Sequence, residues 1–233
     1  MAVHMPTAQK EIVYPDSDGQ PMADNTLQFR WIVTVQGGLE ALFADRLDVF
    51  VAGNLLWYPV EGRPDIRTAP DVMVVFGRPK GDRGSYRQWE EEGIAPQVVF
   101  ETLSPNNTLP EMIRKHRFYE RYGVEEYYLY APDHGELTGW LRQGNTLEEI
   151  ENTRGWVSPL LGIRFDLENG ELVLQKPNGE RFVSFVELAA QRDAERQRAE
   201  QEHQRAERLA CTPAGIRRNR HKSGGGVICF HIA

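Results

Sequence analysis

The chain has 233 residues, of which 40% are hydrophobic and 26% charged, a balance typical of a soluble globular domain with one sizeable core. No apolar run approaches the length of a membrane span, and the N-terminus lacks a basic-then-apolar signal pattern. We therefore expect a cytoplasmic protein with no membrane partner. The only cysteines are Cys211 and Cys229, so residues 1–210 have neither a disulfide framework nor a cysteine-ligated metal site.

The charge is distributed unevenly. The whole chain carries 27 basic and 34 acidic side chains, but the segment after residue 210 has four basic residues and no acidic one. Residues 1–210 therefore carry 23 basic and 34 acidic side chains, a net charge of −11. Such a surface disfavours non-specific binding of nucleic acid, and so argues against a nuclease, although an acidic metal site and a local basic patch can coexist with it.

The first half of the chain predicts an arm, a helix and several strands. Residues 1–24 are polar, and we expect a flexible arm there. Apolar residues recur at helical spacing over about 26–46, with Asp24 or Asn25 as the cap and a kink or break at Gly37-Gly38. The expected segments after this helix are strands at 49–51 and 55–57 beside a turn at Gly53-Asn54, a buried strand at 71–76, a surface loop at 77–93 and a strand containing Glu101.

The second half predicts one more helix before further strands. Thr108 or Asn107 caps a helix that runs to about Tyr122, and Gly123 ends it. The strands that follow are expected at 127–130, 137–142, 146–150, 162–167 and 171–175. This order of helix, strands, helix, strands predicts an α/β domain with a mixed sheet over residues 25–182.

The C-terminal part divides into two segments. Residues 183–210 predict a charged helical extension with acids and arginines at helical pair spacing and a thin alanine stripe. Charge, cysteine use and periodicity all change after Ala210, so we expect residues 211–233 to be a disordered tail outside the fold.

Two predicted strands carry a carboxylate where an apolar residue is expected. Asp71 follows Pro70 at the start of one strand, and Glu101 lies inside QVVFETLSP, where an isolated buried charge costs several kcal/mol. If the strands pair, both carboxylates can project to the same place, because side chains alternate along a strand. Two close carboxylates repel each other unless a cation binds between them, so we expect Mg²⁺ or Mn²⁺ there.

Lys115 is the third candidate residue. The chain has five lysines, and only Lys115 falls in a confidently predicted helix of residues 1–210. That helix follows the Glu101 strand after a short turn, so it can pack back over the carboxylates. An ammonium there can position a water or stabilise phosphate charge. The alternative readings are an arginine partner for Glu101, a turn role for Asp71 and a solvated helix face for Lys115.

The series APDVMVVFG, VVFETLSPNNT and RYGVEEYYLYAPD resembles the Uma-type family of endonucleases, within the PD-(D/E)XK nuclease superfamily, over about residues 24–210. The resemblance implies a restriction-endonuclease-like fold and Mg²⁺-dependent hydrolysis of DNA phosphodiester bonds. It matches Asp71 and Glu101 to the two acidic elements of the motif. The superfamily pattern places a lysine at position 103, where this chain has Leu103, so the resemblance makes Lys115 the candidate lysine.

The remaining site predictions are weaker. Some superfamily folds place a carboxylate on the first helix, which suggests Glu40, and Asn54 lies near the motif in sequence. Lys80, Arg83 and Arg87 in the loop 77–93 are candidates for phosphate contacts. Tyr119 and Tyr127 are interpreted as core or cleft wall.

A second class of function stays open. The acidic composition and Leu103 favour a catalytically inactive nucleic-acid-binding or scaffold protein with the same fold. The sequence contains no G-x-S-x-G elbow, no phosphate-binding loop and no zinc spacing among its six histidines. The oligomeric state is open, with a two-fold homodimer as one option, because nucleases that cut both strands are often dimers.

Overall fold

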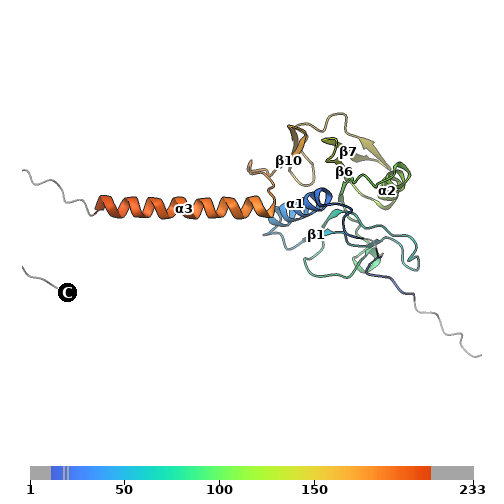
Figure 1. Ribbon diagram of the computed structural model, residues 1–233. Coiled ribbons are helices and arrows are strands. Elements are labelled where there is room, and N and C mark those ends of the chain that lie inside the picture. Colours follow the sequence, from blue (N-terminus) through green and yellow to red (C-terminus); the bar gives the residue numbers. More distant parts are fainter. Residues whose placement is uncertain (1–11, 18, 20, 211–233) are drawn as a thin grey trace, which may run out of the picture. The chain divides into compact units, whose positions relative to one another are not determined.

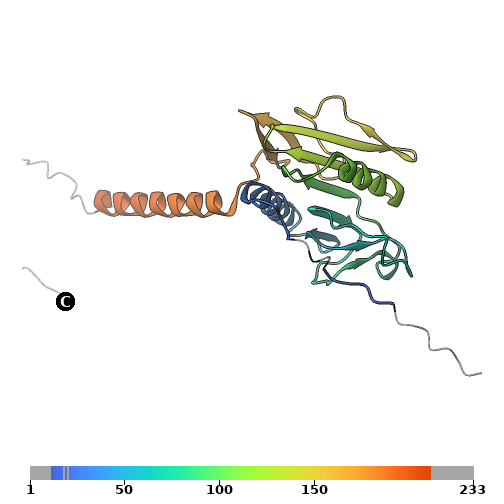
Figure 2. The ribbon, with the colours of Figure 1, turned by 45° about the vertical axis from the view of Figure 1, so that its right-hand side comes forward.

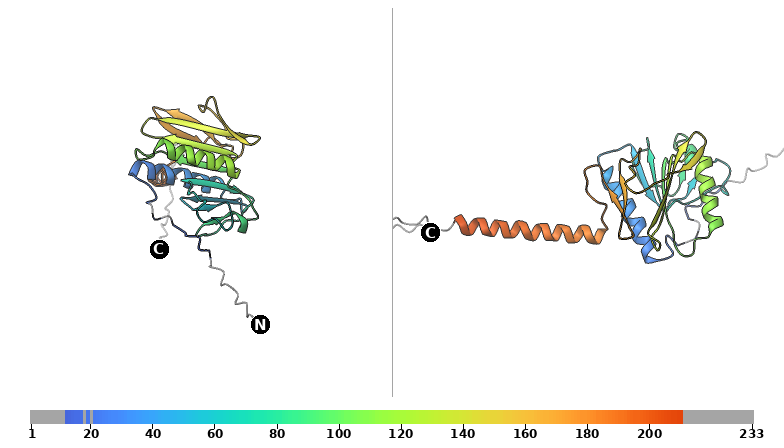
Figure 3. Two further views of the ribbon diagram at one scale, coloured as in Figure 1. Left: turned by 90° about the vertical axis from the view of Figure 1, so that its right-hand side faces the viewer. Right: turned by 90° about the horizontal axis from the view of Figure 1, so that it is seen from above.

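The computed structural model describes residues 12–17, 19 and 21–210, so the expectation for the tail at 211–233 lies outside the described residues. Helices α1 (Thr26–Leu42) and α2 (Leu109–Tyr122) lie on opposite sides of a central sheet, as the right-hand view of Figure 3 shows. One buried cluster joins α1 to the sheet, and the other joins Tyr119 of α2 to the opposite face. The mixed α/β architecture predicted from the sequence is therefore confirmed.

The central sheet has six strands in the order β1-β3-β5-β6-β7-β8 (Figures 1 and 2). Only β5 and β6 run parallel, and the chain between them forms α2, since a parallel pair needs a crossover connection. The strands are β1 (Val49–Gly53), β3 (Val72–Phe76), β5 (Val98–Thr102), β6 (Glu126–Ala131), β7 (Glu136–Gln143) and β8 (Thr146–Glu149).

Helix α1 begins where Asn25 accepts a hydrogen bond from the Gln28 amide at 2.8 Å, as an N-cap residue does. The predicted kink at Gly37-Gly38 is wrong, because α1 runs unbroken to Leu42. Gly38 has a packing role instead. A Cβ at this position would lie 2.1 Å from the Phe182 ring, so only glycine lets that ring lie against the helix.

Helix α2 has a defined boundary at each end. Thr108 is its N-cap, and Gly123 ends it in the left-handed conformation with φ 94°. Arg142 of β7 donates hydrogen bonds to three carbonyls at this C-terminus, those of Val124 (2.8 Å), Glu120 (2.7 Å) and Tyr119 (3.3 Å). These bonds add a charged donor to carbonyls at the end of the helix, where the regular intrahelical pattern stops, and they fix α2 to the sheet.

Two small sheets flank this core. One consists of β9 (Arg164–Glu168) and β10 (Glu171–Gln175), and the other of β2 (Trp57–Tyr58) and β4 (Tyr86–Arg87), which is followed by the short 3₁₀ helix η1 (Gln88–Glu90). The strands expected on either side of Gly53-Asn54 do not pair with each other. β1 pairs with β3, whereas β2 runs parallel to β4.

The N-terminal arm is partly attached to the domain, which corrects the expectation of a flexible arm up to residue 24. The Tyr14 hydroxyl accepts a hydrogen bond from the Gly62 amide, and the Tyr58 hydroxyl donates one to the Pro15 carbonyl at 2.6 Å. The Tyr14 ring also packs against Trp89. These contacts fix residues 14–15.

The charged segment near the C-terminus forms the helix α3 (Phe185–Ala210). Nearly all its described side chains are exposed, as expected for a charged helix whose apolar stripe is thin. The chain forms two compact units, and the boundary between them falls after Val186. The domain is therefore one unit, and the greater part of α3 belongs to the other. Within the described part of the chain, no helix has the length and apolar character needed to cross a membrane.

Candidate active site

The two candidate carboxylates lie next to each other. Asp71 directly precedes β3, and the register pairs the next residue, Val72, with Phe100 of β5. Continuing this antiparallel register by one residue places Asp71 opposite Glu101, and alternation directs both toward the α2 face of the sheet. Asp71 is 6% exposed and Glu101 3% exposed. The sequence prediction that these two carboxylates meet is thus reproduced in the geometry.

The environment of Asp71 disfavours its charged form. Burial and the nearby charge of Glu101 raise the pKa of Asp71 to about 8, against an ordinary value of 3.8. One carboxylate oxygen, Oδ2, accepts a hydrogen bond from the Thr102 amide at 2.7 Å, which ties Asp71 to the end of β5. Burial is the larger cause of the raised pKa, and an added positive charge at this place opposes both causes by favouring the ionised carboxylate.

Glu101 has two partners, both on α2. Lys115 Nζ lies 2.8 Å from Oε2, and the Tyr119 hydroxyl donates a hydrogen bond to Oε1. Burial alone would lower the pKa of Lys115, but the charges of Glu101 and Asp71 more than offset it, so the ammonium stays charged. The ammonium predicted from the following helix therefore does reach the carboxylates.

Three further side chains lie at the site; the sequence assigned Tyr119 and Tyr127 only to the core or cleft wall, and it gave no role to Gln28. Tyr119 follows Lys115 by four residues, a spacing that places both on one helix face and could have indicated its role. Gln28 falls on the apolar stripe of α1 with Ile32, where a polar side chain signals a buried partner. Tyr127 offers no such signal. Burial and the charges of Glu101 and Asp71 raise its pKa well above the ordinary value.

The two weaker candidates lie differently. Asn54 adjoins the site through its backbone, since its amide donates to the carbonyls of Pro70 and Asp71, each at 3.1 Å. Glu40 is exposed on α1, accepts a hydrogen bond from Gln36 at 3.1 Å, and lines a cavity of about 490 Å³ along β1. No described contact joins Glu40 to either carboxylate of the site.

The residues present fit a divalent cation on chemical grounds. Asp71 and Glu101 are hard oxygen ligands, and their mutual repulsion is the condition that a cation removes. The Tyr127 hydroxyl lies near the charges of both carboxylates. It is buried and has no hydrogen-bond partner among the described residues, so it can bind a water molecule. Within the described ranges, no cluster of three or more acidic, histidine or cysteine side chains suited to a metal occurs, so two carboxylates are the acidic ligands available.

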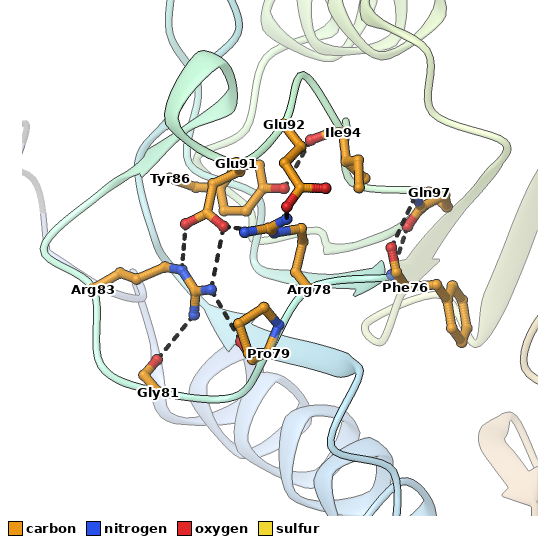
Figure 4. Close-up of polar contacts among 10 residues, drawn as sticks. All are labelled: Phe76, Arg78, Pro79, Gly81, Arg83, Tyr86, Glu91, Glu92, Ile94 and Gln97. Carbon is orange, nitrogen blue, oxygen red and sulfur yellow. Dashed lines mark hydrogen bonds and ion pairs between the residues drawn. The ribbon is translucent and has the colours of Figure 1, made fainter.

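The basic residues of the loop 77–93 are engaged within the fold. Arg83 and Arg78 converge on Glu91, at 2.6 Å and 2.8 Å, and all three side chains are 12–13% exposed (Figure 4). Burial alone would raise the pKa of Glu91, but the two guanidiniums lower it. Lys80 and Arg87 are also engaged. Lys80 donates to the Phe43 carbonyl at the end of α1 at 2.7 Å, and Arg87 pairs with Glu90 at 3.3 Å. The predicted phosphate contacts of Lys80, Arg83 and Arg87 thus compete with internal partners.

A mixed sheet with acidic residues on neighbouring strands and a lysine on the following helix defines a restriction-endonuclease-like protein. The chain belongs to the Uma2 family, whose model is described as "Putative restriction endonuclease" and matches residues 23–172, more than half of the chain. The family predicted from the sequence is thereby confirmed.

Two further comparisons add less. A crystal structure of a "putative nuclease belonging to DUF820" from Anabaena variabilis is similar over 56% of this chain and 70% of that chain, at 14% identity and a TM-score of 0.40. We base no argument on similarity at this level. A search of curated proteins finds no match.

Proposed function

We propose that the protein is a metal-dependent endonuclease that hydrolyses DNA phosphodiester bonds. The observation that carries the proposal is the convergence of Asp71, Glu101 and Lys115, which come from a strand start, a strand interior and a helix. Membership of a restriction endonuclease family supports the reaction class. DNA as the substrate and Mg²⁺ as the ion are our inferences from that class.

Each side chain has a role that follows from its environment. Asp71 and Glu101 are the residues that hold a divalent cation through oxygen. When bound, such a cation supplies Lewis-acid chemistry, lowering the pKa of a water and neutralising charge on the phosphoryl group. Lys115 keeps its proton beside two carboxylates, so it acts as a fixed positive charge for the phosphate and not as a general base.

Glu101 must change partners for this function. Its two oxygens are bonded to Lys115 and Tyr119, so to hold a cation Glu101 would share an oxygen with it or release the Lys115 ammonium. Lys115 is 20% exposed, which allows its Nζ to reach a phosphate at the surface of the site. The Tyr119 hydroxyl is fully buried and holds the carboxylate in place while Lys115 moves.

A second candidate function is a non-catalytic nucleic-acid-binding or scaffold protein with the same fold. The observation that favours it is the completeness of the Glu101 environment, in which the carboxylate already has a cation and a hydroxyl as partners. The net charge of −11 for residues 1–210 points the same way.

Cleavage of supercoiled plasmid DNA with added Mg²⁺ or Mn²⁺ separates the two functions. We expect the wild type to nick the plasmid, and Glu101→Gln and Lys115→Met each to reduce the rate by about two orders of magnitude or more. Glu148→Gln, at an exposed position of β8, is the matched control and should cleave normally. Equal cleavage by the wild type and Glu101→Gln, or none by any protein, contradicts the proposed function.

A further inference from the structure

Gln28 is a buried amide at the edge of the candidate site. It lies in the first turn of α1 and is 6% exposed, with Ile32 one helical turn further on. Its Nε2 donates a hydrogen bond to the carbonyl of Thr102, at the end of β5, at 2.9 Å. Gln28 thus links the first helix to the strand that carries Glu101, across 74 residues of sequence.

The orientation of this amide is fixed by its neighbours. The Gln28 Oε1 accepts a hydrogen bond from the backbone amide of Asp24 at 2.8 Å. A backbone amide can only donate, so Oε1 must face Asp24 and the NH₂ group must face the strand. Asp24 is held in turn by the Ser104 hydroxyl. A neutral donor is therefore aimed at the end of β5 and cannot flip without the loss of both bonds.

The same NH₂ group serves two oxygen-bearing groups of the site. It donates to the Thr102 carbonyl, and its presence lowers the pKa of the Asp71 carboxylate, which accepts a hydrogen bond from the Thr102 amide. Gln28 and Asp71 therefore both interact with the backbone of Thr102, one at its carbonyl and the other at its amide. The side chain that α1 contributes to the edge of the site is therefore the neutral amide of Gln28. An acidic side chain at this position would add a third carboxylate to the site.

The charges of the site suit one divalent cation. With a cation bound and both carboxylates ionised, the described part of the chain provides Asp71 and Glu101 as negative groups and Lys115 as a positive group, with no cluster of three metal-binding side chains. A single dication makes the total charge of the site +1, whereas two dications make it +3, held about 4 Å apart as two-metal sites require.

We propose that Gln28 is a positioning residue that keeps the α1 side of the site neutral and thereby limits the site to one divalent cation. The inference rests on the proposed function. A carboxylate at position 28 would stand beside Asp71 and the Thr102 carbonyl and complete a second set of oxygen ligands.

The test counts Mn²⁺ ions bound by the metal-stripped full-length chain, from the electron paramagnetic resonance signal of free Mn²⁺. We expect one tightly bound ion in the wild type and two in Gln28→Glu. Gln28→Met has similar volume and no added charge, and should keep a single, more weakly bound ion. Gln143→Glu, an exposed position on β7 given the same change of charge, should behave as the wild type.

The outcomes are distinguishable. Two ions in the wild type, or one in Gln28→Glu, overturn the role of Gln28 and leave the proposed metal site standing. No bound ion in the wild type overturns the metal site and this inference together. If Gln28→Glu does not fold without metal, it is purified with Mn²⁺ and its metal is counted by mass spectrometry, where a content of one ion per chain has the same meaning.

Discussion

Glu101 is a buried carboxylate whose two oxygens are both bonded to side chains of α2. A carboxylate without partners at 3% exposure costs several kcal/mol, so the paired arrangement is what makes a strand with a central glutamate stable. Lys115 and Tyr119 therefore have a structural as well as a chemical role. Lys115→Met removes one partner and leaves a buried charge incompletely satisfied, whereas Glu101→Gln removes the charge itself.

Asp71 makes the stability of the metal-free protein depend on pH. Its pKa is raised from 3.8 to about 8 in the folded state, so the folded protein holds a proton there that the unfolded chain releases. The stabilisation from this proton is present at acid pH and is lost as the pH rises toward about 8. We expect urea unfolding in the presence of a chelator to show a free energy of unfolding that falls from about pH 5 to about pH 8, by up to about 1.4 kcal/mol per pH unit.

The matched variants for this prediction are Asp71→Asn and Asp133→Asn. Asp71→Asn cannot titrate, so its free energy of unfolding should change less with pH than that of the wild type. Asp133 is exposed, and Asp133→Asn should keep the wild-type slope. A wild-type slope that survives in Asp71→Asn contradicts the assignment of the proton to Asp71.

The sequence predicts those site residues whose positions follow from the regular geometry of one strand or helix, and it misses those placed by contacts between distant segments. Asp71 and Glu101 were predictable because strand alternation and a plausible pairing bring them together. Lys115 needed the further assumption that α2 packs over them. Gln28 was not found, because helical periodicity marks its position as buried but does not say which strand it meets.

At the scale of elements, α2 is the unit that brings Lys115 and Tyr119 to the carboxylates. Its C-terminus is held by Arg142, which donates to three carbonyls there. Bonds from a charged donor to carbonyls at a helix C-terminus are stronger than neutral ones and are favoured by the helix dipole. The position of α2 therefore depends on an arginine from β7.

Arg142→Leu tests this dependence. We expect the free energy of unfolding to fall by about 2–3 kcal/mol, because the carbonyls at the end of α2 lose their partners. The measurement is urea unfolding followed by circular dichroism. Arg154→Leu, at an exposed position, is the control and should change stability by no more than about 0.5 kcal/mol. Equal effects of the two substitutions contradict the anchoring role.

Local sequence patterns are sufficient to predict some boundaries of helices and strands but not others. The boundaries of α2 were predictable because Thr108 and Gly123 act locally, through capping and a left-handed φ. Gly37-Gly38 misled the prediction, because the need for glycine at Gly38 comes from Phe182, which lies far away in sequence. The pairing of β2 with β4 likewise depends on a long-range contact, across a loop, that no local pattern specifies.

The whole molecule combines an acidic composition with membership of a family described as "Putative restriction endonuclease". The loop 77–93 does not offset this charge freely, because Arg78 and Arg83 are both paired with Glu91, and Arg78 is also paired with Glu92. Under the proposed function, DNA binding therefore depends on few phosphate contacts and is weak outside the site. The bound cation and Lys115 then supply much of the attraction at the scissile phosphate.

Because the domain and most of α3 are separate compact units, we expect the domain to fold without α3. A chain that ends at Val186 retains the whole of the first unit, and the part of α3 removed is almost entirely exposed. We expect its melting temperature to lie within about 2 °C of the full chain, because exposed residues contribute little to stability. A chain that ends at residue 160 lacks Phe165, Leu172 and Leu174 of the core and should not fold. A large loss of stability at Val186 contradicts the division into two units.

The central claim is that Asp71 and Glu101 hold a divalent cation beside Lys115. The most direct measurement is an anomalous difference map from crystals of the full-length protein grown or soaked with Mn²⁺, with data collected near the manganese absorption edge. The account predicts a peak bonded to carboxylate oxygens of both Asp71 and Glu101, with Lys115 Nζ moved away from Glu101. A map with no peak at these carboxylates, and with the Lys115–Glu101 pair intact at 2.8 Å, would show that the cation of this site is the lysine alone.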